Sequence, residues 1–451
     1  MGRMRIRAGR ATWPAPPVPL WGATRTALLA LGIAVGLGLG TLGCSHPATP
    51  SGGSTPSDGL AGGARSATRA PGSGSASPTS RALPATQVTG DWRSWTQSLS
   101  GPVASGACDA TAHQVVCGAG ADGFAGRSRV TGAVTWQIPS LAAGRSVGLV
   151  LSASDERAVA AGADALHAAN LRTGTSAWSH RLPPGRTYVA LAQGAGTVYA
   201  TDAAAGSPGG NSTVELTAYR AADGTVLWHR GGVTADPAEP PRASGGRVYT
   251  TDGSVVTARD ARTGDVVATS RAGTECPQLV AGGGYLVCTG DGLSASDTFP
   301  PVVRLDPVTL RPLRTLRDSG MKPVRALFSD DGVLVLYEEN AEDGSTGDWT
   351  AFDLDSGAAL WSYPATSEQG ALDGGRFVTF TPGNDSHQGR LISMGLRAGP
   401  AGKGTAAPRL SPAYPETSGS RYPAVIVPGG GGGHLVVRTT VRGALRSVPA
   451  P

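Results

Sequence analysis

The sequence lacks the short motifs that mark common hydrolytic and phosphate-binding sites. Its 451 residues contain no HExxH pair, and its seven histidines are scattered. The glycine run at residues 429–433 is not followed by the Lys and Ser or Thr of a phosphate loop. We therefore predict no catalytic residue from these motifs.

An excess of basic residues is also lacking outside the N-terminal region. The formal net charge is +5, but residues 1–43 hold five arginines and no acidic residue, so the remainder is neutral. A neutral domain does not carry the basic surface that binding to phosphates requires. We predict no nucleic-acid partner.

Cysteines are few, and none stands in a CxxC spacing or beside another cysteine. Four of the five form two pairs, Cys108 with Cys117 and Cys276 with Cys288, and each pair brackets a predicted hairpin. Adjacent antiparallel strands bring Cα atoms within about 4.5–5.5 Å, which a disulfide can span. We predict two disulfides. The competing interpretation, a metal site, lacks CxxC spacing and an adjacent histidine.

What the sequence has in abundance is glycine in a repeating pattern. Residues 245–268 read as three short strands separated by turns. A small residue or Asp, then Gly, then three variable residues and Trp recur at intervals of roughly 40 to 50 residues, the period of a four-stranded propeller blade. Gly permits a positive φ in the turn, and Trp fills the space between blades. The predicted blade-packing tryptophans are Trp95, Trp136, Trp178, Trp228 and Trp361.

The segments AYRAADGTVLW, ARDARTGDVVA and AFDLDSGAALW resemble repeats of the PQQ-like (pyrroloquinoline-quinone-like) β-propeller superfamily. This superfamily includes quinoprotein dehydrogenases and the lipoprotein subunit of the outer-membrane β-barrel assembly machine. The resemblance covers residues 89–451 and implies an all-β propeller of about eight, alternatively seven, four-stranded blades. The segment TGDWRSWTQSL resembles the end of a blade, so we expect this N-terminal strand to complete the C-terminal blade.

The N-terminal region is predicted to be a targeting segment. Residues 1–43 combine arginines with a short apolar stretch, and TLGC resembles a bacterial lipobox in which Cys44 is lipidated. The alternative is an uncleaved single-span anchor. Residues 44–88 are rich in Ser, Thr, Pro, Gly and Ala and predict a disordered linker. Either interpretation places the domain outside the cytoplasm, anchored to the bacterial cell membrane.

Four long loops, at residues 202–213, 291–301, 338–348 and 383–389, are expected between the second and third strands of their blades. The same connection in successive blades emerges on one face, which we predict to be the binding face. Tyr337, Glu338, Glu339 and Trp349 are the candidate binding patch there. The acidic loop offers oxygen ligands for calcium, but it lacks EF-hand spacing, and a solvated polar loop is the alternative; no metal ligand is predicted.

These features predict a monomeric binding or scaffolding module at the cell envelope, with an envelope protein as its partner. One alternative is an oxidoreductase that uses PQQ with calcium, although the vicinal cysteine pair of many quinoprotein dehydrogenases is absent. Another is a sensor of cell-envelope ligands. Because a fold does not fix function, the repeat alone does not decide among them.

Overall fold

The computed structural model describes most of the chain after residue 80. The described residues are 81–82, 93–98, 108–117, 124–138, 148–206, 212–237, 239–290, 299–318, 321–339, 346–366, 368–381, 390–412, 425–427, 434–439 and 444–451. The predicted signal or anchor segment, Cys44 and the linker before Arg81 lie outside them. Nearly all regular structure in this part is β, with one short 3-10 helix at Gly404–Ala406. No helix of the described part is long and apolar enough to span a bilayer.

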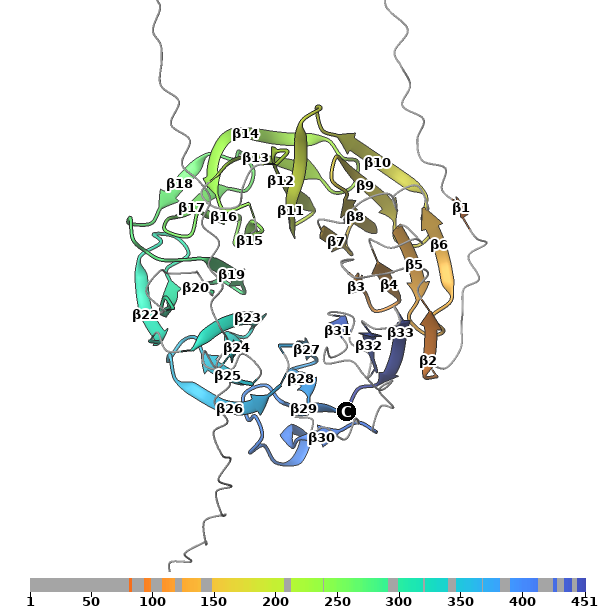
Figure 1. Ribbon diagram of the computed structural model, residues 1–451, viewed down its shortest axis with the longest axis vertical. Helices are drawn as coiled ribbons and strands as arrows, with labels where there is room; N and C mark the ends of the chain where they lie inside the picture. The colour runs from red at the N-terminus through yellow and green to blue at the C-terminus, as the bar shows by residue number, and fades with distance from the viewer. Residues whose placement is uncertain are drawn as a thin grey trace, which may run out of the picture. The chain divides into compact units, whose positions relative to one another are not determined.

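Eight antiparallel sheets stand around one axis, seven of four strands and one of five (Figure 1). We number them blades 1 to 8 in chain order. The innermost strands are β3 (Cys108–Ala110), β7 (Gly148–Ser152), β11 (Arg186–Gly194), β15 (Arg242–Ser244), β19 (Gln278–Gly282), β23 (Lys322–Ser329), β27 (Gly370–Asp373) and β31 (Val425–Val427). The predicted all-β propeller of about eight blades is confirmed.

In the blades whose four strands have described side chains, the two middle strands are the most buried. The second strands are β4 (Gln114–Cys117), β8 (Arg157–Ala161), β12 (Thr197–Ala204), β16 (Arg247–Thr251), β20 (Tyr285–Thr289), β24 (Val333–Glu339), β28 (Arg376–Phe380) and β32 (His434–Thr439). The third strands are β5 (Phe124–Ser128), β9 (Ala165–Asn170), β13 (Ser212–Arg220), β17 (Val256–Asp260), β21 (Val302–Leu305), β25 (Gly347–Asp353), β29 (Leu391–Gly395) and β33 (Ala444–Pro449). Because neighbouring blades cover both faces of a sheet, β24 reads as a continuous apolar run rather than an alternating one.

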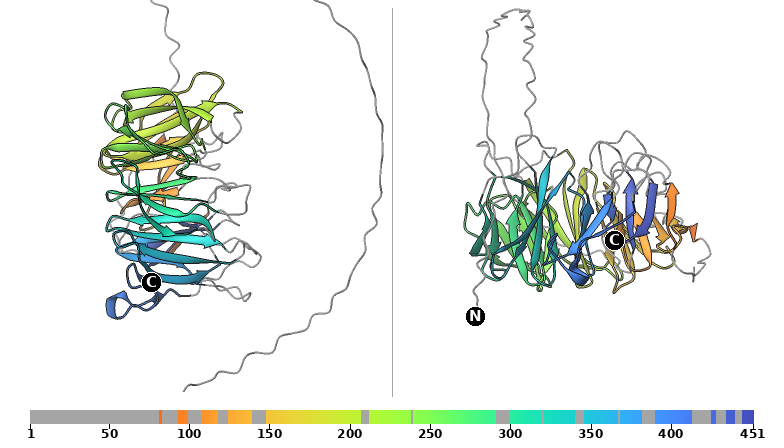
Figure 2. Two further views of the ribbon diagram at one scale, coloured as in Figure 1. Left: turned by 90° about the vertical axis from the view of Figure 1, so that its left-hand side faces the viewer. Right: turned by 90° about the horizontal axis from the view of Figure 1, so that it is seen from below.

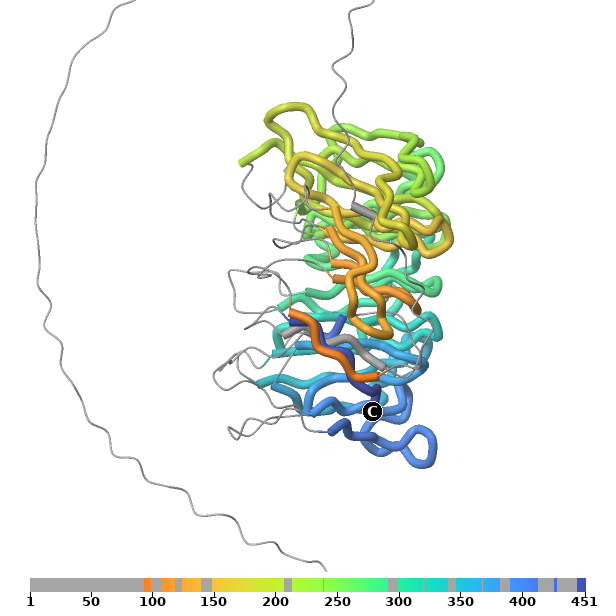
Figure 3. The backbone as a smooth tube through the Cα atoms, turned by 90° about the vertical axis from the view of Figure 1, so that its right-hand side faces the viewer, coloured from red at the N-terminus to blue at the C-terminus, as the bar shows by residue number. Residues whose placement is uncertain are grey.

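The outermost strands run along the perimeter. They are β6 (Val134–Ile138), β10 (Ser176–Arg181), β14 (Val226–Ala235), β18 (Val266–Thr269), β22 (Pro312–Arg317), β26 (Ala359–Ala365), β30 (Arg409–Leu410) and β2 (Trp95–Ser98). The last of these comes from the N-terminal end of the propeller. It pairs with β33 from Trp95 opposite Ser447 to Ser98 opposite Ala444, and Figure 3 shows the orange N-terminal strand beside the dark blue C-terminal segment. The predicted closure is confirmed, and it leaves no open edge between the first and last blades.

In blades 4, 5 and 6 an aspartate caps the turn before the outermost strand, as in the segment ARDARTGDVVA. The Asp260 carboxylate accepts backbone N–H bonds from Arg262 at 2.8 Å and Thr263 at 3.0 Å. These bonds hold its pKa below the ordinary value because they favour the charged form. The turn then needs a left-handed residue, and Gly264 supplies it with φ of 75°.

In five blades the tryptophan of the repeat joins the blade to the next one. Trp136 is fully buried, and its indole N–H donates to the carbonyl of Leu171 in blade 2 at 2.7 Å. Its ring lies on Gly174, where a Cβ would overlap it. The same donation at 2.7–2.9 Å is made by Trp95 to Arg129, Trp178 to Ala221, Trp228 to Ala261 and Trp361 to Leu396. The structure therefore places all five of the expected tryptophans between blades.

Blades 4 and 5 meet without a tryptophan. Ala268 takes the tryptophan position, and Leu310 takes the glycine position with φ of 57°, buried in the same apolar cluster. The carbonyl of Pro307, which corresponds to the indole acceptor, instead accepts bonds from Tyr249 Oη at 3.0 Å and Arg247 Nη1 at 3.2 Å. A small residue on blade 4 and a large one on blade 5 therefore fill this junction together. Its backbone acceptor keeps hydrogen-bond donors although no indole is present.

One strand lies where the sequence predicted a disordered linker. β1 (Arg81–Ala82) pairs with β6, Arg81 opposite Gln137 and Ala82 opposite Trp136, and becomes the fifth strand of blade 1. The expected linker end at residue 88 stays a prediction. The outermost strand of a blade has free backbone N–H and C=O groups on one side, so an extended segment can pair with them.

Candidate functional site

The four predicted insertions all leave the propeller on one face. They follow β12, β20, β24 and β28, the second strands of blades 3, 5, 6 and 7. Equivalent strands of successive blades run from one face of the propeller to the other in the same direction (Figure 2). We call this the insertion face and define it by the strand ends Cys117, Ala204, Thr289, Glu339 and Phe380. The central residues of the insertions lie outside the described part.

Both predicted disulfides are present and lie at this face. Cys108 and Cys117 join the start of β3 to the end of β4 in blade 1, with Cα atoms 4.1 Å apart. In blade 5, Cys276, two residues before β19, is joined to Cys288 near the end of β20, with Cα atoms 4.8 Å apart. Each bridge fixes a first strand to the second strand of its own blade, at the face from which the insertions leave.

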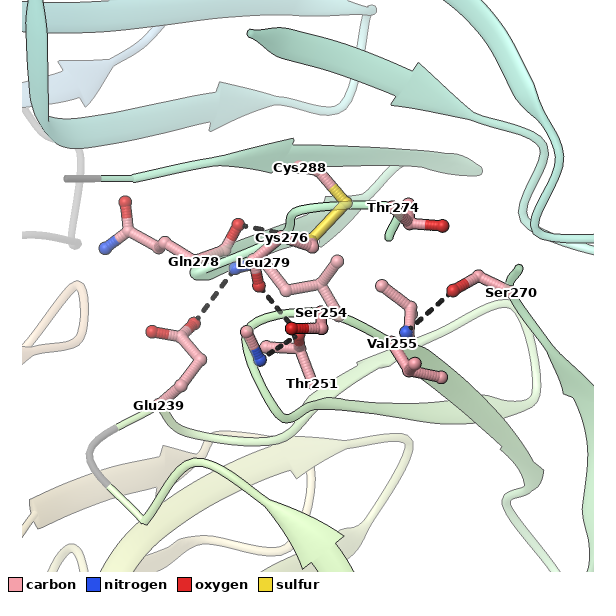
Figure 4. The surroundings of a disulfide bond; sticks show 12 residues. Glu239, Thr251, Ser254, Val255, Ser270, Thr274, Cys276, Gln278, Leu279 and Cys288 are labelled. Atoms are coloured by element: carbon pink, nitrogen blue, oxygen red, sulfur yellow. Dashed lines mark hydrogen bonds between the residues drawn. A yellow bond between two sulfur atoms is a disulfide. The ribbon is translucent and has the colours of Figure 1, made fainter. Parts of the chain in front are cut away.

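Glu239 ties blade 4 to the second disulfide (Figure 4). Its carboxylate accepts the backbone N–H of Leu279 at 3.2 Å and pairs with Arg242 at 3.0 Å. Arg242 in turn donates to the Leu279 carbonyl at 2.7 Å, and Thr251 Oγ1 donates to the Cys276 carbonyl at 2.6 Å. Burial raises the pKa of Glu239, and Arg242 opposes that rise. The network holds the first strand of blade 5 rigidly beside blade 4.

A cavity of about 320 Å³ lies at the axis, between the innermost strands of blades 1 to 5. Its lining includes Asp109, Leu149, Leu191, Gln193, Arg242 and Ala281. Burial raises the pKa of Asp109 to about 6, although its carboxylate accepts the backbone N–H of Ala110 at 2.7 Å. The exposed surface of its wall is mostly polar, so the cavity lacks the predominantly apolar wall of a usual small-ligand pocket.

The lining of this cavity does not fit a calcium-bound quinone. Such a site needs several carboxylate and amide oxygens around the ion, and Asp109 is the one carboxylate in the cavity wall that the structure describes. Across the described ranges, no group of three or more His, Cys, Asp or Glu residues could hold a metal. We therefore derive no redox step through this cavity.

A polar cluster across all four strands of blade 3 was not anticipated from the sequence. His229 Nε2 lies 2.8 Å from Glu215, and Arg186 bridges Glu215 at 3.7 Å and the buried carboxylate of Asp202. Burial raises the pKa of Asp202, and the hydrogen bond from Arg186 opposes it. The four residues come from four strands, so no local motif in the sequence connects them.

The candidate binding patch requires a correction, because its two aromatic residues are buried. Trp349 is fully buried, Tyr337 is 3% exposed, and their rings pack 5.2 Å apart between blades 6 and 7. Trp349 also packs on Phe377 of blade 7 at 4.9 Å between centroids. Both are core residues and are not available as surface anchors. β24 continues to Glu339 and β25 begins at Gly347, so the loop between them is shorter than the sequence suggested.

The two acidic residues of the expected patch are also held in the fold. Glu338 is 1% exposed and pairs with Arg317 of blade 5 at 2.9 Å, while Glu339 pairs with Lys322 at 3.3 Å. Burial raises the pKa of Glu338 to about 7; Arg317 opposes the rise and Asp348, directly opposite on β25, adds to it. Glu338 therefore joins two blades instead of facing solvent.

Because the pKa of Glu338 is raised, its ionisation should destabilise the fold as the pH increases. The unfolded chain releases this proton near the ordinary value, so the free energy of unfolding should fall between about pH 4.5 and pH 7. In Glu338→Gln this part of the fall should disappear, and the variant should gain about 1–3 kcal/mol on the wild type between pH 5 and pH 8. Urea titrations across that range measure the difference.

Glu339→Gln is the matched control, because it removes the same charge one residue further along β24. Glu338→Gln and wild-type curves that stay parallel from pH 5 to pH 8 would show that Glu338 is ionised in the folded protein throughout.

Beside this pair, at the outer part of the insertion face, a second cavity of about 520 Å³ is lined by blade 6. Its wall includes Met321, Thr346, Asp348, Pro364 and Thr366. Met321 contacts Arg317 at 3.3 Å, so the cavity stands next to the ion pair that joins blades 5 and 6. The structure therefore shows a recess at the axis and another near the rim of the insertion face.

Comparison with known proteins identifies the repeat. A family model described as outer membrane protein assembly factor BamB matches residues 85–268 and 210–390, together more than half of the chain. No curated protein matches the sequence.

Several solved structures share the architecture. The computationally designed protein Ika8 has 15% identity and a TM-score of 0.55, over 78% of this chain and 98% of Ika8. Sqt1 of Saccharomyces cerevisiae has 10% identity and a TM-score of 0.55, over 80% and 100%. Quinohemoprotein alcohol dehydrogenase from Comamonas testosteroni has 12% identity and a TM-score of 0.52, over 80% and 76%. At these identities the likeness shows the fold alone.

Proposed function

The chain belongs to the PQQ-like β-propeller family represented by the outer membrane protein assembly factor BamB, and from this premise we propose that it is a protein-binding or scaffolding module at the cell envelope. A propeller is a rigid body that presents loops at fixed positions, and recognition needs only a few anchors on such a platform. The insertion face is the surface that we assign to the partner.

The observation that carries this proposal is that four blades lengthen the same connection. Blades 3, 5, 6 and 7 each extend the link between their second and third strands, so the additions gather on one face of the ring. Repeat proteins place insertions where they bind, because a loop there does not disturb the stacking of repeats. Two disulfides brace the strands that carry this face.

We place the propeller outside the cytoplasm and tether it to a membrane. Disulfides persist in oxidising compartments, so the two disulfides of this chain support a location outside the cytoplasm. The N-terminal arginines, the apolar stretch and Cys44 support a lipid anchor, and the linker that follows would give the domain reach. A partner in or near the envelope fits this arrangement.

Site-specific photo-crosslinking in native membranes tests the proposal. A photoreactive side chain would replace Ala205 in blade 3 or Thr366 in blade 6, both of which are exposed at the insertion face. The same replacement of Thr173, exposed in a turn on the opposite face, is the control. We expect one protein to be captured from both insertion-face positions and not from Thr173, as identified by mass spectrometry.

Capture of the same protein from Thr173 alone would move the binding surface to the other face. Capture of nothing above background at any of the three positions would contradict the proposal of a protein-binding module.

A further inference from the structure

The outermost strands of the propeller are not all covered alike. In blade 1 the open edge of β6 is occupied by β1, which pairs with it as an added strand. In blades 3, 4 and 5 the strands β14, β18 and β22 are the last of their sheets, and each has a neighbour on one side alone. The molecule itself thus shows that a blade edge of this fold accepts an extended segment.

Exposed apolar side chains concentrate on these three consecutive blades. Of seven large hydrophobic residues that are exposed in the described part of the chain, six lie there and one, Leu410, lies in blade 7. The six, which we call the apolar band, are Val226, Leu227, Val266, Val267, Val308 and Leu313. Val266 at 52% and Val267 at 48% exposure stand at its centre, on β18.

Hydrogen bonds at the junctions hold the blades that carry the band next to one another. Trp228 of β14 donates to the carbonyl of Ala261 in the turn of blade 4 that precedes β18. Arg247 of blade 4 donates at 2.7 Å to the carbonyl of Val308, in the turn of blade 5 that precedes β22. Figure 1 shows β14, β18 and β22 following one another along the perimeter.

β18 carries neither charge nor proline, although it is short and a β-bulge shifts its register against β17. Natural edge strands carry charges or proline that discourage pairing. Pro312 stands in β22 and Pro364 in β26, and β10, β14 and β30 carry charged residues. β2 has no charge but is polar, whereas β18 reads Val-Val-Ala-Thr, with high strand propensity and no charge.

Exposed arginines lie on blades 3 to 5 with the apolar band, together with the exposed acidic residues Asp265 and Glu275. Arg220 and Arg230 are paired with Asp223 and Asp265. In contrast, Arg271, Arg311 and Arg314 are exposed, and their side chains form no ion pair with any described residue. Arg271 follows β18 by two positions, and the other two flank Leu313 of the band.

We propose that the outer edge of blade 4 binds an extended acidic segment of a partner protein, which adds to the sheet as a strand beside β18. Backbone hydrogen bonds to the free edge supply affinity, and alternate side chains of the segment give specificity. Its apolar side chains pack on Val266 and Val267, and its carboxylates face Arg271 and Arg311. This inference rests on the proposed protein-binding function and assigns a second contact surface to it.

The probe is a short peptide of alternating glutamate and valine, and its matched control has lysine at each glutamate. With the full-length protein in detergent, we expect saturable binding of the glutamate peptide and at least about tenfold weaker binding of the lysine peptide. Amide hydrogen exchange reports the mode, because pairing at the edge should slow exchange in Val266–Thr269.

Two variants with the same substitution at the same strand position separate this site from general charge effects. Val267→Asp places a carboxylate just before the Ala268 position, and Ala177→Asp does so just before Trp178 on β10. We expect Val267→Asp to weaken the glutamate peptide at least about tenfold and Ala177→Asp to leave it unchanged.

Absence of binding, equal binding of the two peptides, or binding without protection of β18 would overturn the inference. A further result would also overturn it: the protein binds phosphatidylglycerol vesicles, Val267→Asp abolishes this binding, and the peptide does not slow amide exchange in β18. The band would then be a membrane-binding surface. These measurements use no cellular partner. A negative result here therefore leaves the crosslinking result on the insertion face valid, and a negative crosslinking result leaves the peptide measurements valid.

Discussion

Trp136→Ala should lower the free energy of unfolding by about 3–5 kcal/mol, the range found when a buried aromatic side chain is removed from a core. The side chain is fully buried, packs on Phe124 with ring centroids 5.3 Å apart, and covers Gly174 of the next blade. Its loss also leaves the Leu171 carbonyl without its indole donor. Urea titration followed by circular dichroism measures the change.

Two further variants separate the contributions to this loss. Trp136→Phe keeps part of the packing and removes the indole N–H, so it should cost less than the alanine variant. Leu227→Ala, on the exposed side of a comparable outer strand, should stay within about 0.5 kcal/mol of the wild type. A loss in Trp136→Ala no larger than that of Leu227→Ala would mean that the tryptophan does not hold the blades together.

The sequence predicted these tryptophans because the repeat gives the same local solution many times. In blades 1, 2, 3 and 6 a left-handed glycine and, four positions later, an indole occur within one turn and one strand, so each copy can be recognised without its neighbours. The disulfides were predictable for the same reason, since both partners belong to one hairpin. The ring closure followed from an incomplete repeat at each end.

The binding patch was not predictable in this way, because its burial depends on residues far away in the sequence. Trp349 is covered by Phe377 of the following blade, and Glu338 is held by Arg317 of the preceding one. Acidic residues at the end of an apolar run resemble the start of a loop, and only the long-range ion pair extends the strand to Glu339. The blade 3 cluster and β1 escaped prediction because they too depend on pairing between strands.

Ala268→Trp should destabilise the propeller by about 1–3 kcal/mol, although tryptophan is the residue found at this position in five other blades. Leu310 of blade 5 occupies the space that a glycine leaves free elsewhere, and it is 1% exposed within the cluster that contains Ala268. An indole added there would have no volume to enter. Urea titration measures the loss, and Ala177→Trp on β10, at an exposed position, is the control for surface tryptophan.

Leu310→Gly alone should also destabilise, by about 2–5 kcal/mol, because it empties a packed site, and relief of the left-handed φ of 57° returns part of that loss. When the two changes are combined, the new indole can cover the new glycine as Trp228 covers Gly264. The double variant should therefore be more stable than the sum of the single losses predicts, by about 1–3 kcal/mol, the range seen for residues in contact. Additive losses would show that Ala268 and Leu310 do not share one volume. The coupling free energy between the two substitutions tells whether the pair of residues or tryptophan itself specifies a blade junction. The structure favours the pair, because the Pro307 carbonyl still accepts hydrogen bonds from Tyr249 and Arg247 where no indole is present.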